Sequence, residues 1–526
     1  MTPDDTKRLP EAELPKLAES VRGRIVDAVA ANGGHLASSL GAVELAIGIL
    51  RAFDPPRDRV LWDVGHQAYA WKILTGREGR FSTLRKHGGL APFLSPDESD
   101  CDAFISGHAG VALAAAAGFA AANARSGGGR VVAVVGEASL MNGESLEALG
   151  CIGRLGLKVI VALNDNGRGG DRHEALFGAF GMRCIGPVDG HDAGAVAAAF
   201  EEAKAADCAV AVHVVTKKGK GFAPAEEDPE AWHSAAPFGD AVAGRRAMPM
   251  AADALAAAAR RDSRVCAVVA AMKNGTGLSA FAEEFPERFF DVGIREEMAV
   301  TFAAGLAKAG MRPVVAIYST FLQRAIDQIQ HDVCLQRLPV VFAVDHAGCV
   351  GADGATHHGL YDIALLRPLA GMRIFAPTCR EEVGELLDEA LRLGVPAAIR
   401  YPKGALPARK AVGDCVGAQV RILAVGDQVE KALKVKWILA EKGLGADVVP
   451  VSRVKPADAA ARCGARLLVS VENGVTCGGF GEHVGADLKF GWPDAAVGHG
   501  TVEELEKDFG FDPESIAEAI WRNSMG

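Results

Sequence analysis

The sequence predicts an α/β protein with parallel sheets, organised as two large α/β domains followed by a smaller one. Strand-like apolar runs alternate with stretches of helical periodicity along the whole chain. At 526 residues the chain has room for about three or four domains of ~150 residues each. An apolar share of 49% is enough to fill a hydrophobic core in every one of them.

The expected domain boundaries follow from breaks in this alternation. We expect a first domain over residues 1–240, a second over 246–405 and a third over 418–526. A low-order stretch from Ser234 to Gly244 connects the first two domains, and a charged, Val-rich segment from about 406 to 418 connects the last two. No short-period repeat is present, so the recurring unit is the α/β domain itself.

The best-marked unit of the first domain runs from Val131 to Asn166. It consists of a buried-strand run at 131–135, a stretch of helical spacing and a second apolar run at 159–163. Parallel sheets bind ligands outside the carboxyl ends of their strands. Because Glu137 and the cluster Asn164–Asn166 follow two such ends, we expect a carboxylate and an amide oxygen to meet at one edge of the sheet.

Other elements are predicted from the same patterns. Helices are expected over about 11–31, 42–52, 111–123 and 431–442, and strands over about 60–63, 209–215 and 467–471. Three histidines, His35, His66 and His108, lie at turns of the first domain, where α/β domains bind ligands.

Composition excludes several classes of protein. A net charge of −10 without a dense Lys/Arg run argues against nucleic acid or an anionic membrane as the main partner. The N-terminus lacks an apolar signal region, and the Ala-rich run Val111–Ala122 is too short to cross a bilayer, so we expect a cytoplasmic protein. The 11 cysteines form no C-x-x-C pair, which indicates reduced thiols and neither a zinc site nor a disulfide framework.

A carboxylate and amide oxygens beside a helix start suit a hard cation such as Mg²⁺ carrying a diphosphate. The pattern resembles the thiamine diphosphate signature, Gly-Asp-Gly followed just under thirty residues later by Asn-Asn. Glu137 and Asn166 are 29 positions apart, which fits, but Glu137 replaces the aspartate and Ala138 the second glycine. Glutamate adds a methylene, so metal binding is expected to be weaker. An ordinary buried strand-helix-strand unit with a polar loop would give the same pattern.

Longer stretches resemble one family, the 1-deoxy-D-xylulose-5-phosphate synthases, which are thiamine diphosphate enzymes related to transketolase. The stretches are Asp63–Tyr69, Gly186–Asp192, Ala316–Ala325, and Val350–Gly354 with Thr356-His357. The resemblance covers nearly the whole chain, and runs of this length are far more specific than a single motif. It implies two thiamine-diphosphate-binding parallel-sheet domains, one for the diphosphate with Mg²⁺ and one for the pyrimidine, and a smaller C-terminal domain of transketolase type.

The resemblance also implies an activity. The enzyme would be a transferase that decarboxylates pyruvate on the cofactor and adds the two-carbon unit to glyceraldehyde 3-phosphate, for isoprenoid (methylerythritol phosphate pathway), thiamine and pyridoxal precursors. Thiamine diphosphate and Mg²⁺ would be its cofactors, and it would be a homodimer.

The family pattern assigns roles to individual residues. The metal ligands would be Glu137, Asn166 and the backbone carbonyl of Arg168. The catalytic residues would be Glu296, His35, His66 and His357, with Glu296 bonded to the pyrimidine ring nitrogen. The cofactor would contact His66, Gly107, His108, Gly136, Glu137, Ala138, Asn166, Lys217, Glu296 and Phe321. The substrates would be bound by His35, Tyr318, Asp345 and His357, with Arg324 and Arg400 as a forked clamp for the acceptor phosphate.

Three departures from the family pattern leave two alternatives open. The first is Glu137-Ala138. The second is Glu297-Met298 where the family has Gln-His, together with the loss of hydroxyl residues after His108. The third is a short segment between Asn166 and Cys184, which predicts a reduced cover over the site.

The altered pocket residues favour, as one alternative, a paralogue that transfers the same unit between other sugars or oxo acids. Glu137 and Met298 favour, as the other, a degenerate homologue that binds partners without turnover. The retained polar set of Glu296, Arg324, His357 and Arg400 argues against the second alternative, because a pocket freed from catalysis has no physical need for it.

Overall fold

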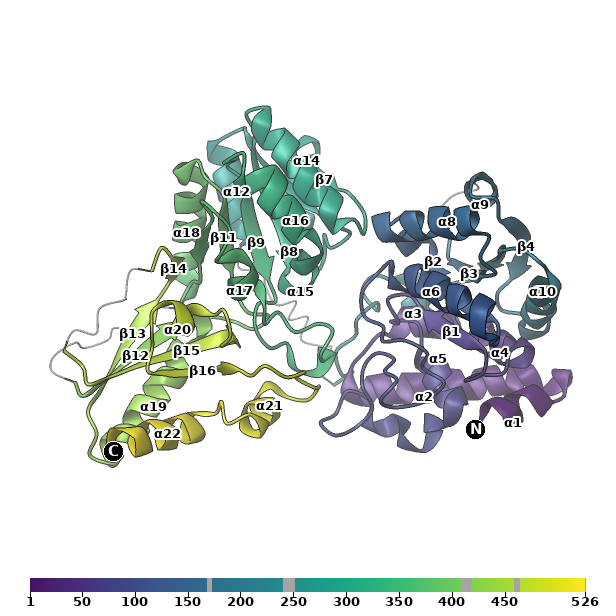
Figure 1. Cartoon of the computed structure of the whole chain (residues 1–526), viewed down its shortest axis with the longest axis horizontal. Coiled ribbons are helices and arrows are strands. Elements are labelled where there is room, and N and C mark those ends of the chain that lie inside the picture. The colour runs from purple at the N-terminus through teal and green to yellow at the C-terminus, as the bar shows by residue number, and fades with distance from the viewer. Residues whose placement is uncertain (168–172, 240–250, 409–417, 458–463, 526) are drawn as a thin grey trace. The chain divides into compact units, whose positions relative to one another are not determined.

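Three sheets organise the chain (Figure 1). The computed structural model describes residues 1–167, 173–239, 251–408, 418–457 and 464–525. By its internal contacts the chain divides into two compact units, Met1–Gly244 and Arg245–Gly526. The first unit holds one sheet, and the second unit holds the other two. The expected connector at 406–418 and the expected start of the second domain near Met248 lie largely outside the described residues.

The sheet of the first unit is fully parallel, with the strand order β1-β2-β3-β5-β4. Its strands are β1 (Arg59–Trp62), β2 (Val131–Gly136), β3 (Ile160–Asp165), β4 (Arg183–Asp189) and β5 (Val210–Val215). The strands predicted at 60–63, 131–135, 159–163 and 209–215 are therefore confirmed, each within about two residues.

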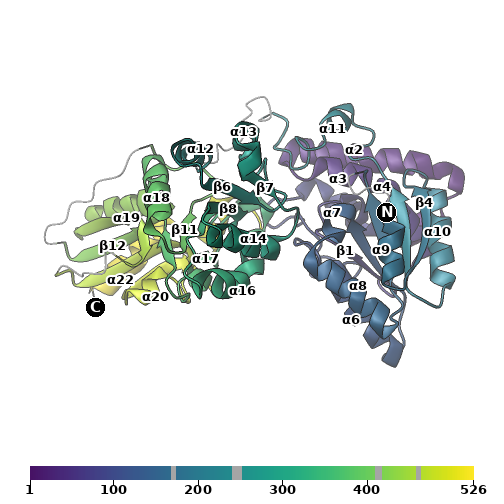
Figure 2. The ribbon, with the colours of Figure 1, turned by 90° about the horizontal axis from the view of Figure 1, so that it is seen from above.

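Helices cover both faces of this sheet (Figure 2). Val132 and Val134 of β2 pack in one core with α2 (Leu14–Asn32), α4 (Val43–Ala52) and α10 (Ala193–Ala205). Val131 and Val135 pack in a second core with α6 (Val111–Ser126) and α8 (Gly143–Leu155). Successive side chains of a strand point to opposite faces, so a continuous apolar run is required when both faces are covered.

The second unit begins with a seven-stranded sheet of order β14-β10-β11-β9-β8-β6-β7. Its parallel strands are β6 (Val265–Val269), β7 (Phe289–Asp291), β8 (Arg312–Tyr318), β9 (Val341–Asp345), β10 (Arg373–Phe375) and β11 (Ala397–Arg400). The edge strand β14 (Arg453–Lys455) is antiparallel to β10. One face is covered by α12 (Ala252–Arg261) and α18 (Arg380–Leu393), and the other by α14 (Glu296–Lys308).

The third sheet is parallel, with the order β13-β12-β15-β16. Its strands are β12 (Val420–Val425), β13 (Ala446–Val451), β15 (Leu467–Val475) and β16 (Leu488–Trp492), and α19 (Val429–Glu441) and α22 (Pro513–Met525) cover one face. The other face contributes Leu423, Val425 and Leu468 to the core that also contains Phe342 and Val344 of β9. The C-terminal sheet therefore shares a hydrophobic core with the second sheet.

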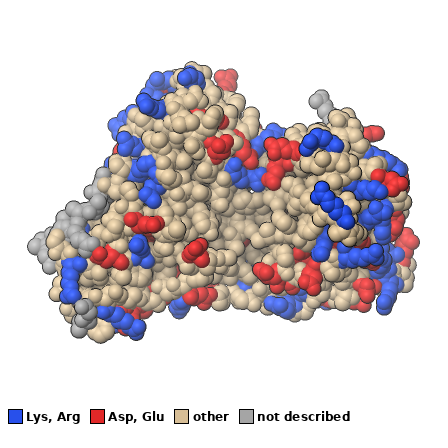
Figure 3. Space-filling model, viewed as in Figure 1, with Lys and Arg blue, Asp and Glu red and all other residues tan. Residues whose placement is uncertain are grey.

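The distribution of charged residues on the surface agrees with the absence of a dense Lys/Arg run in the sequence. Lys and Arg are interspersed with Asp and Glu over the face shown in Figure 3, without a broad patch of one sign. None of the described helices is long and apolar enough to cross a membrane.

Candidate active site

The carboxyl ends of β2, β3 and β5 lie side by side in the first sheet. The register pairs Gly136 at the end of β2 with Asn164 in β3, and β3 and β5 end together. The residues that follow these strands therefore leave the sheet at one edge, where parallel sheets bind ligands. Glu137 and Asn166 are two of them.

Glu137 and Asn166 are in direct contact. Glu137 is the first residue of α7 (Glu137–Leu140) and is 3% exposed. Burial raises the pKa of its carboxyl group, although backbone N–H groups of Glu137 and Asn166 donate hydrogen bonds to it and Lys218 lies near. The buried side-chain oxygen of Asn166 accepts no hydrogen bond from the described residues. The backbone of Asn166 thus reaches the Glu137 carboxylate, and the side-chain oxygen of Asn166 has spare capacity to accept a ligand.

These two groups fit a hard divalent cation. Carboxylate and amide oxygens are ligands that Mg²⁺ accepts. The described residues contain no group of three or more His, Cys, Asp or Glu side chains that could hold a metal ion. Arg168, whose backbone carbonyl is the third expected ligand, lies outside the described residues. The fit therefore depends on Glu137 and Asn166.

A chain of hydrogen bonds braces this edge. Asn164 Nδ2 donates to Gln67 Oε1 over 2.6 Å, and Thr216 Oγ1 donates to Asn164 Oδ1 over 2.5 Å. All three side chains are buried. These hydrogen bonds join the ends of β3 and β5 to the loop after β1, which carries His66. The Asn164 side chain is committed to these hydrogen bonds, whereas Asn166 contacts Glu137 through its backbone N–H.

The lysine that acts on Glu137 is Lys218. Lys217, which the sequence analysis expects at the cofactor, instead pairs its ammonium group with Glu226. The charge of Lys218 lowers the pKa of the Glu137 carboxyl group against the larger effect of burial. The expected contact of Lys217 with the cofactor stays a prediction. Two consecutive lysines in a turn point in different directions, and the sequence alone does not say which of them faces the site.

The Gly186–Asp192 stretch supports the same turn. His191 Nε2 accepts the Lys217 backbone N–H over 2.8 Å, and His191 Nδ1 lies 3.4 Å from Glu44 Oε2. Glu44 is in turn paired with Arg22 at 2.5 Å. His191 therefore connects the turn that presents Lys218 to Glu44 of α4, which is paired with Arg22 of α2.

Three histidines of the first unit lie close together. The ring centroids of His35 and His66 are 6.2 Å apart, and those of His66 and His233 are 5.1 Å apart. An antiparallel bridge between Gly34 and Ala235 brings His233 to this place. His233 could not be found from the sequence, because a bridge between residues so far apart in the chain leaves no local pattern.

Asp63 holds the turn that carries His108. Its carboxylate accepts the N–H groups of Gly110 (3.0 Å) and Ala112 (2.9 Å) at the start of α6, and Asp63 is 1% exposed. The next residue, Val64, donates its N–H to the His108 carbonyl over 3.3 Å and has a φ of 58°. A positive φ is an outlier for a β-branched residue, and such strain gathers at functional sites.

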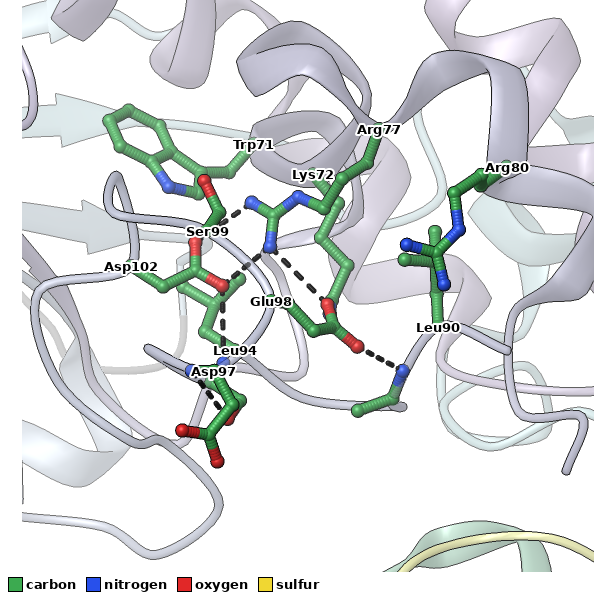
Figure 4. A network of polar contacts seen from close by, with 12 residues as sticks. Trp71, Lys72, Arg77, Arg80, Leu90, Leu94, Asp97, Glu98, Ser99 and Asp102 are labelled. Carbon is green, nitrogen blue, oxygen red and sulfur yellow. Dashed lines mark hydrogen bonds and ion pairs between the residues drawn. The ribbon is translucent and has the colours of Figure 1, made fainter. Parts of the chain in front are cut away.

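A buried ion network holds the segment that leads to His108 (Figure 4). Two guanidinium nitrogens of Arg77 contact Asp102, at 2.5 and 2.8 Å, and Glu98 accepts from both Arg77 and Lys72. Asp102 also accepts the backbone N–H of Ser95 over 3.1 Å. The network ties this irregular segment to α5 (Tyr69–Lys72) and the turn that follows it.

In the second unit, Glu296 is the first residue of α14 and is 4% exposed. Burial raises the pKa of its carboxyl group to about 7, although the nearby charge of Arg324 opposes the shift. Glu296 Oε2 is buried and accepts no hydrogen bond from the described residues. A buried acid of this kind can hold a proton at neutral pH and hydrogen-bond to a ring nitrogen.

Four rings gather near the ends of β8 and β9. Tyr318 stacks on His346 at a centroid distance of 3.8 Å and lies parallel to Phe321 at 5.9 Å. Phe321 meets His357 edge to face at 5.7 Å. Tyr318, Phe321 and His357 are residues that the sequence analysis assigns to cofactor or substrate. His346 is one that it missed.

His346 is fixed by its neighbour Asp345. Asp345 Oδ1 accepts the His346 backbone N–H over 2.6 Å and lies 2.9 Å from His346 Nδ1. His346 has a φ of 55°, which is uncommon for a residue with a side chain. Burial, and then the charge of Asp345, raises the pKa of the Tyr318 hydroxyl group. Asp345 therefore affects the ring cluster in two ways, by fixing the position of His346 and by raising the pKa of Tyr318.

Comparison with known proteins decides the family. A family model described as 1-deoxy-D-xylulose-5-phosphate synthase matches residues 1–173 and 170–216. The transketolase pyrimidine binding domain matches residues 247–409, and the transketolase C-terminal domain matches residues 409–516. A 1-deoxy-D-xylulose-5-phosphate synthase 1 of Geobacter sulfurreducens is 41% identical, over 98% of this chain and 95% of that protein. The chain belongs to the 1-deoxy-D-xylulose-5-phosphate synthase family.

Other members of the synthase family align as fully. The 1-deoxy-D-xylulose-5-phosphate synthase 2 of Geobacter sulfurreducens is 42% identical over 99% of this chain and 98% of that protein, and the synthase of Thermomicrobium roseum is 41% identical over 98% and 96%. A transketolase structure from Campylobacter jejuni is 18% identical over 98% of this chain and all of that one, with a TM-score of 0.47. Family membership makes this chain a thiamine-diphosphate-dependent enzyme of the transferase class.

The two arginines expected to clamp the acceptor phosphate have different surroundings in this synthase-family member. Arg324 lies beside Glu296 and Glu297, at 3.6 Å from each. Arg400 is 4% exposed, donates from Nε to Asp362 over 2.8 Å and donates from a terminal nitrogen to the Asn473 carbonyl over 2.7 Å. Arg400 therefore joins the second sheet to the third, and its expected role at the acceptor phosphate stays a prediction.

Two residues that depart from the synthase-family pattern, Ala138 and Met298, lie at exposed positions of helices. Ala138 is exposed in the first turn of α7, where the backbone does not require glycine. Met298 is 45% exposed on α14, on the turn that Glu296 begins. Neither side chain disturbs the contacts of Glu137 or Glu296 described above.

Proposed function

We propose that this chain is a 1-deoxy-D-xylulose-5-phosphate synthase. It decarboxylates pyruvate and transfers the remaining two-carbon unit to glyceraldehyde 3-phosphate, for isoprenoid and thiamine biosynthesis in the cytoplasm. The observation that carries this proposal is an identity of about 40% with relatives of that name over nearly the full length of both chains. The buried acid Glu296 in the part that matches the pyrimidine binding domain supports it.

Glu137 and Asn166 are proposed to bind Mg²⁺, which neutralises the diphosphate of the cofactor. Lys218 adds a positive charge at the same edge, and His66 and His108 flank it on braced turns. When bound, thiamine diphosphate supplies an electron sink at the carbon from which carbon dioxide leaves. The protein supplies position and charge, which are the two contributions expected of it in a cofactor enzyme.

Glu296 is proposed to bond the pyrimidine ring nitrogen. With a pKa near 7, both the protonated and the ionised form are populated at neutral pH, so the carboxyl group can give a proton to a ring nitrogen and take it back. Arg324, 3.6 Å away, stabilises the ionised form. Phe321, parallel to Tyr318, offers an aromatic face of the kind that stacks on a pyrimidine.

The remaining residues are proposed to bind substrate and move protons. The guanidinium group of Arg324 suits the phosphate of the acceptor, because it is permanently charged and presents forked donors. Tyr318 and Asp345, with His346 between them, line the same side. His35, His66 and His357 are candidates for proton transfer, and His233 joins the first two.

A homodimer is also proposed. Phe104 is 40% exposed and Ile105 is 50% exposed, next to the turn that carries His108. Two neighbouring exposed apolar side chains at a ligand edge are suited to being covered by a second copy. Sedimentation equilibrium tests the assembly state, and an Ile105→Glu variant should shift it toward the monomer.

The decisive experiment titrates the apo protein with thiamine diphosphate, with and without Mg²⁺, by calorimetry. Release of carbon dioxide from carboxyl-labelled pyruvate is then measured with and without glyceraldehyde 3-phosphate. The proposal expects Mg²⁺-dependent binding and release coupled to consumption of the acceptor. Release that ignores glyceraldehyde 3-phosphate would select the paralogue with another acceptor, and absence of cofactor binding would select the degenerate homologue.

A further inference from the structure

The loop between β9 and α17 (Asp362–Leu366) carries two rings of the candidate site. We call residues 346–361 the site loop, and His346 and His357 are the two rings. The loop contains one short 3₁₀ turn, Gly351–Asp353, and is rich in glycine. An antiparallel bridge between Gly348 and Gly359 joins its two arms, and contacts from the C-terminal sheet add to this internal support.

Asn473, in β15 of the third sheet, makes the first of these contacts. Its Oδ1 accepts the Cys349 backbone N–H over 3.0 Å and the Trp492 Nε1–H over 2.9 Å. Its Nδ2 donates to Asp427 Oδ2 over 2.8 Å. Two donors on one side and a carboxylate on the other fix the orientation of the amide, because a flipped amide would meet donors with its own N–H groups.

The site loop also passes very close to Asn473. Gly348 has a φ of 85°, and a Cβ atom built on it would lie 2.2 Å from the Asn473 amide. Only glycine is compatible with both the backbone conformation and the approach. The loop and β15 are therefore packed in direct contact at this point.

His358, within the site loop, makes the second contact. Its Nδ1 accepts the Val350 backbone N–H over 3.1 Å, and its Nε2 lies 2.8 Å from the Gly498 carbonyl. An N–H donor at Nδ1 and a carbonyl acceptor at Nε2 together require the neutral ring with its proton on Nε2. His358 is 3% exposed, so water does not compete for either bond.

We propose that Asn473 and His358 are positioning residues, through which the C-terminal sheet holds the site loop and sets His346 and His357 at the candidate site. Asn473 holds Cys349, and His358 joins Val350 to Gly498. Both anchor points lie three or four residues from His346. This gives a role to the C-terminal sheet, to which no catalytic or binding residue is assigned.

The mechanism is preorganisation. Rings that must meet cofactor or substrate lose efficiency when the segment carrying them samples other positions, and a displacement of about 1 Å can reduce the rate by about 10²-fold. The inference depends on the proposed function for its effect on turnover. The protection of the site loop against hydrogen exchange can be measured in the apo protein, without turnover.

A pair of variants separates the two bonds of His358. His358→Asn places its amide near the Nδ1 position, so it can keep the bond to Val350 and loses the bond to Gly498. His358→Gln reaches the Nε2 position, so it can keep the bond to Gly498 and loses the bond to Val350. His331→Gln is the matched control, because His331 is 74% exposed outside the site.

Hydrogen exchange of the full-length apo protein, followed by mass spectrometry, gives the first measurement. Peptides covering 346–361 are expected to exchange at least about 10-fold faster in both His358 variants than in the wild type or the control, with β12 and β15 unchanged. Exchange that is unchanged in the site loop would overturn the proposal. His358→Asn is the milder change and keeps the test valid if His358→Gln does not fold.

Affinity for thiamine diphosphate and turnover give the second measurement. Both variants are expected to lose about 10- to 100-fold in kcat/KM for pyruvate. The Mg²⁺-dependent part of the affinity for thiamine diphosphate is expected to change little, because Glu137 and Asn166 belong to the first unit. Faster loop exchange with wild-type kcat/KM would overturn the positioning role. A wild-type protein that fails to decarboxylate pyruvate would contradict the proposed function, while the exchange result would still report on the loop.

Discussion

Glu296 Oε2 lies 3.6 Å from Arg324 Nε, and both side chains are nearly buried, at 5% and 11% exposure. The positive charge favours the ionised carboxylate, but burial has the larger effect and raises the pKa of Glu296 to about 7. The pair therefore keeps a proton available at neutral pH, next to a charge that stabilises its departure.

Replacement of the proposed acid should abolish turnover without unfolding the protein. Glu296→Gln keeps the size of the side chain but cannot move a proton, so kcat is expected to fall by about 10³-fold. Steady-state carbon dioxide release measures the loss, and circular dichroism checks the fold. Glu283→Gln, at an exposed position of α13 (Ser279–Glu284), is the control and should retain most activity. Near-wild-type turnover in Glu296→Gln would remove Glu296 from the mechanism.

The same variant should be more stable than the wild type at high pH. The folded-state pKa of about 7 lies above the ordinary value of 4.5, so the unfolded chain releases this proton first as the pH rises. The wild type therefore loses stability between these values, by an amount on the order of 3 kcal/mol. Urea unfolding at pH 4.5, 6 and 8 should show a difference between Glu296→Gln and wild type that grows and then levels off above pH 7.

Glu472 does not contribute to the difference in unfolding free energy between Glu296→Gln and the wild type. Burial raises its pKa to about 7 as well, but it is present in both proteins, so its contribution cancels in the difference. A difference in the free energy of unfolding that stays constant with pH would contradict the raised pKa of Glu296.

Mg²⁺ dependence should follow the charge of Glu137. Glu137→Gln is expected to weaken Mg²⁺-dependent binding of thiamine diphosphate by about 100-fold, because a neutral amide replaces the carboxylate ligand. Glu137→Asp keeps the charge and restores the family residue, so it should bind Mg²⁺ at least as well as the wild type. Calorimetric titration measures both. Glu147→Gln, on the exposed side of α8, is the control, and equal affinity in Glu137→Gln would move the metal elsewhere.

The two arginines should behave differently. Arg324→Lys is expected to raise KM for glyceraldehyde 3-phosphate by about 10-fold with little change in stability, because lysine lacks the forked donors. Arg400→Leu should instead reduce the free energy of unfolding by roughly 3 to 5 kcal/mol, since it leaves Asp362 buried without its partner. Denaturant unfolding and acceptor kinetics on both variants separate the roles. A raised acceptor KM in a stable Arg400→Leu protein would contradict this structural role and support Arg400 as part of the phosphate clamp.

The sequence alone was sufficient for the elements and for part of the site. Strands such as β2 and β3 are local apolar runs bounded by turn residues, and their periodicity does not depend on the rest of the fold. Glu137 and Asn166 directly follow two neighbouring parallel strands, so their meeting could be predicted from the pattern. Glu296 was placed by its motif, and its burial agrees with an apolar setting.

Only the tertiary structure decided which side chains complete each cluster. His233 reaches His35 through a bridge between Gly34 and Ala235, and His346 reaches Tyr318 through a left-handed backbone conformation. Such contacts depend on long-range pairing and on the direction of single side chains, and neither leaves a periodic signal in the chain.

The same reason explains Lys217, Lys218 and Arg400. Their residue types suit an anion or an ion pair, and the folded structure brings Lys218 near Glu137, Lys217 to Glu226 and Arg400 to Asp362. Hydrophobic patterning is a property of neighbours along the chain, so the sequence determined the sheets and the edge at which Glu137 and Asn166 meet. The partner of a charged side chain is set by whichever opposite charge the folded core brings within a few ångströms, so the tertiary structure determined those pairs.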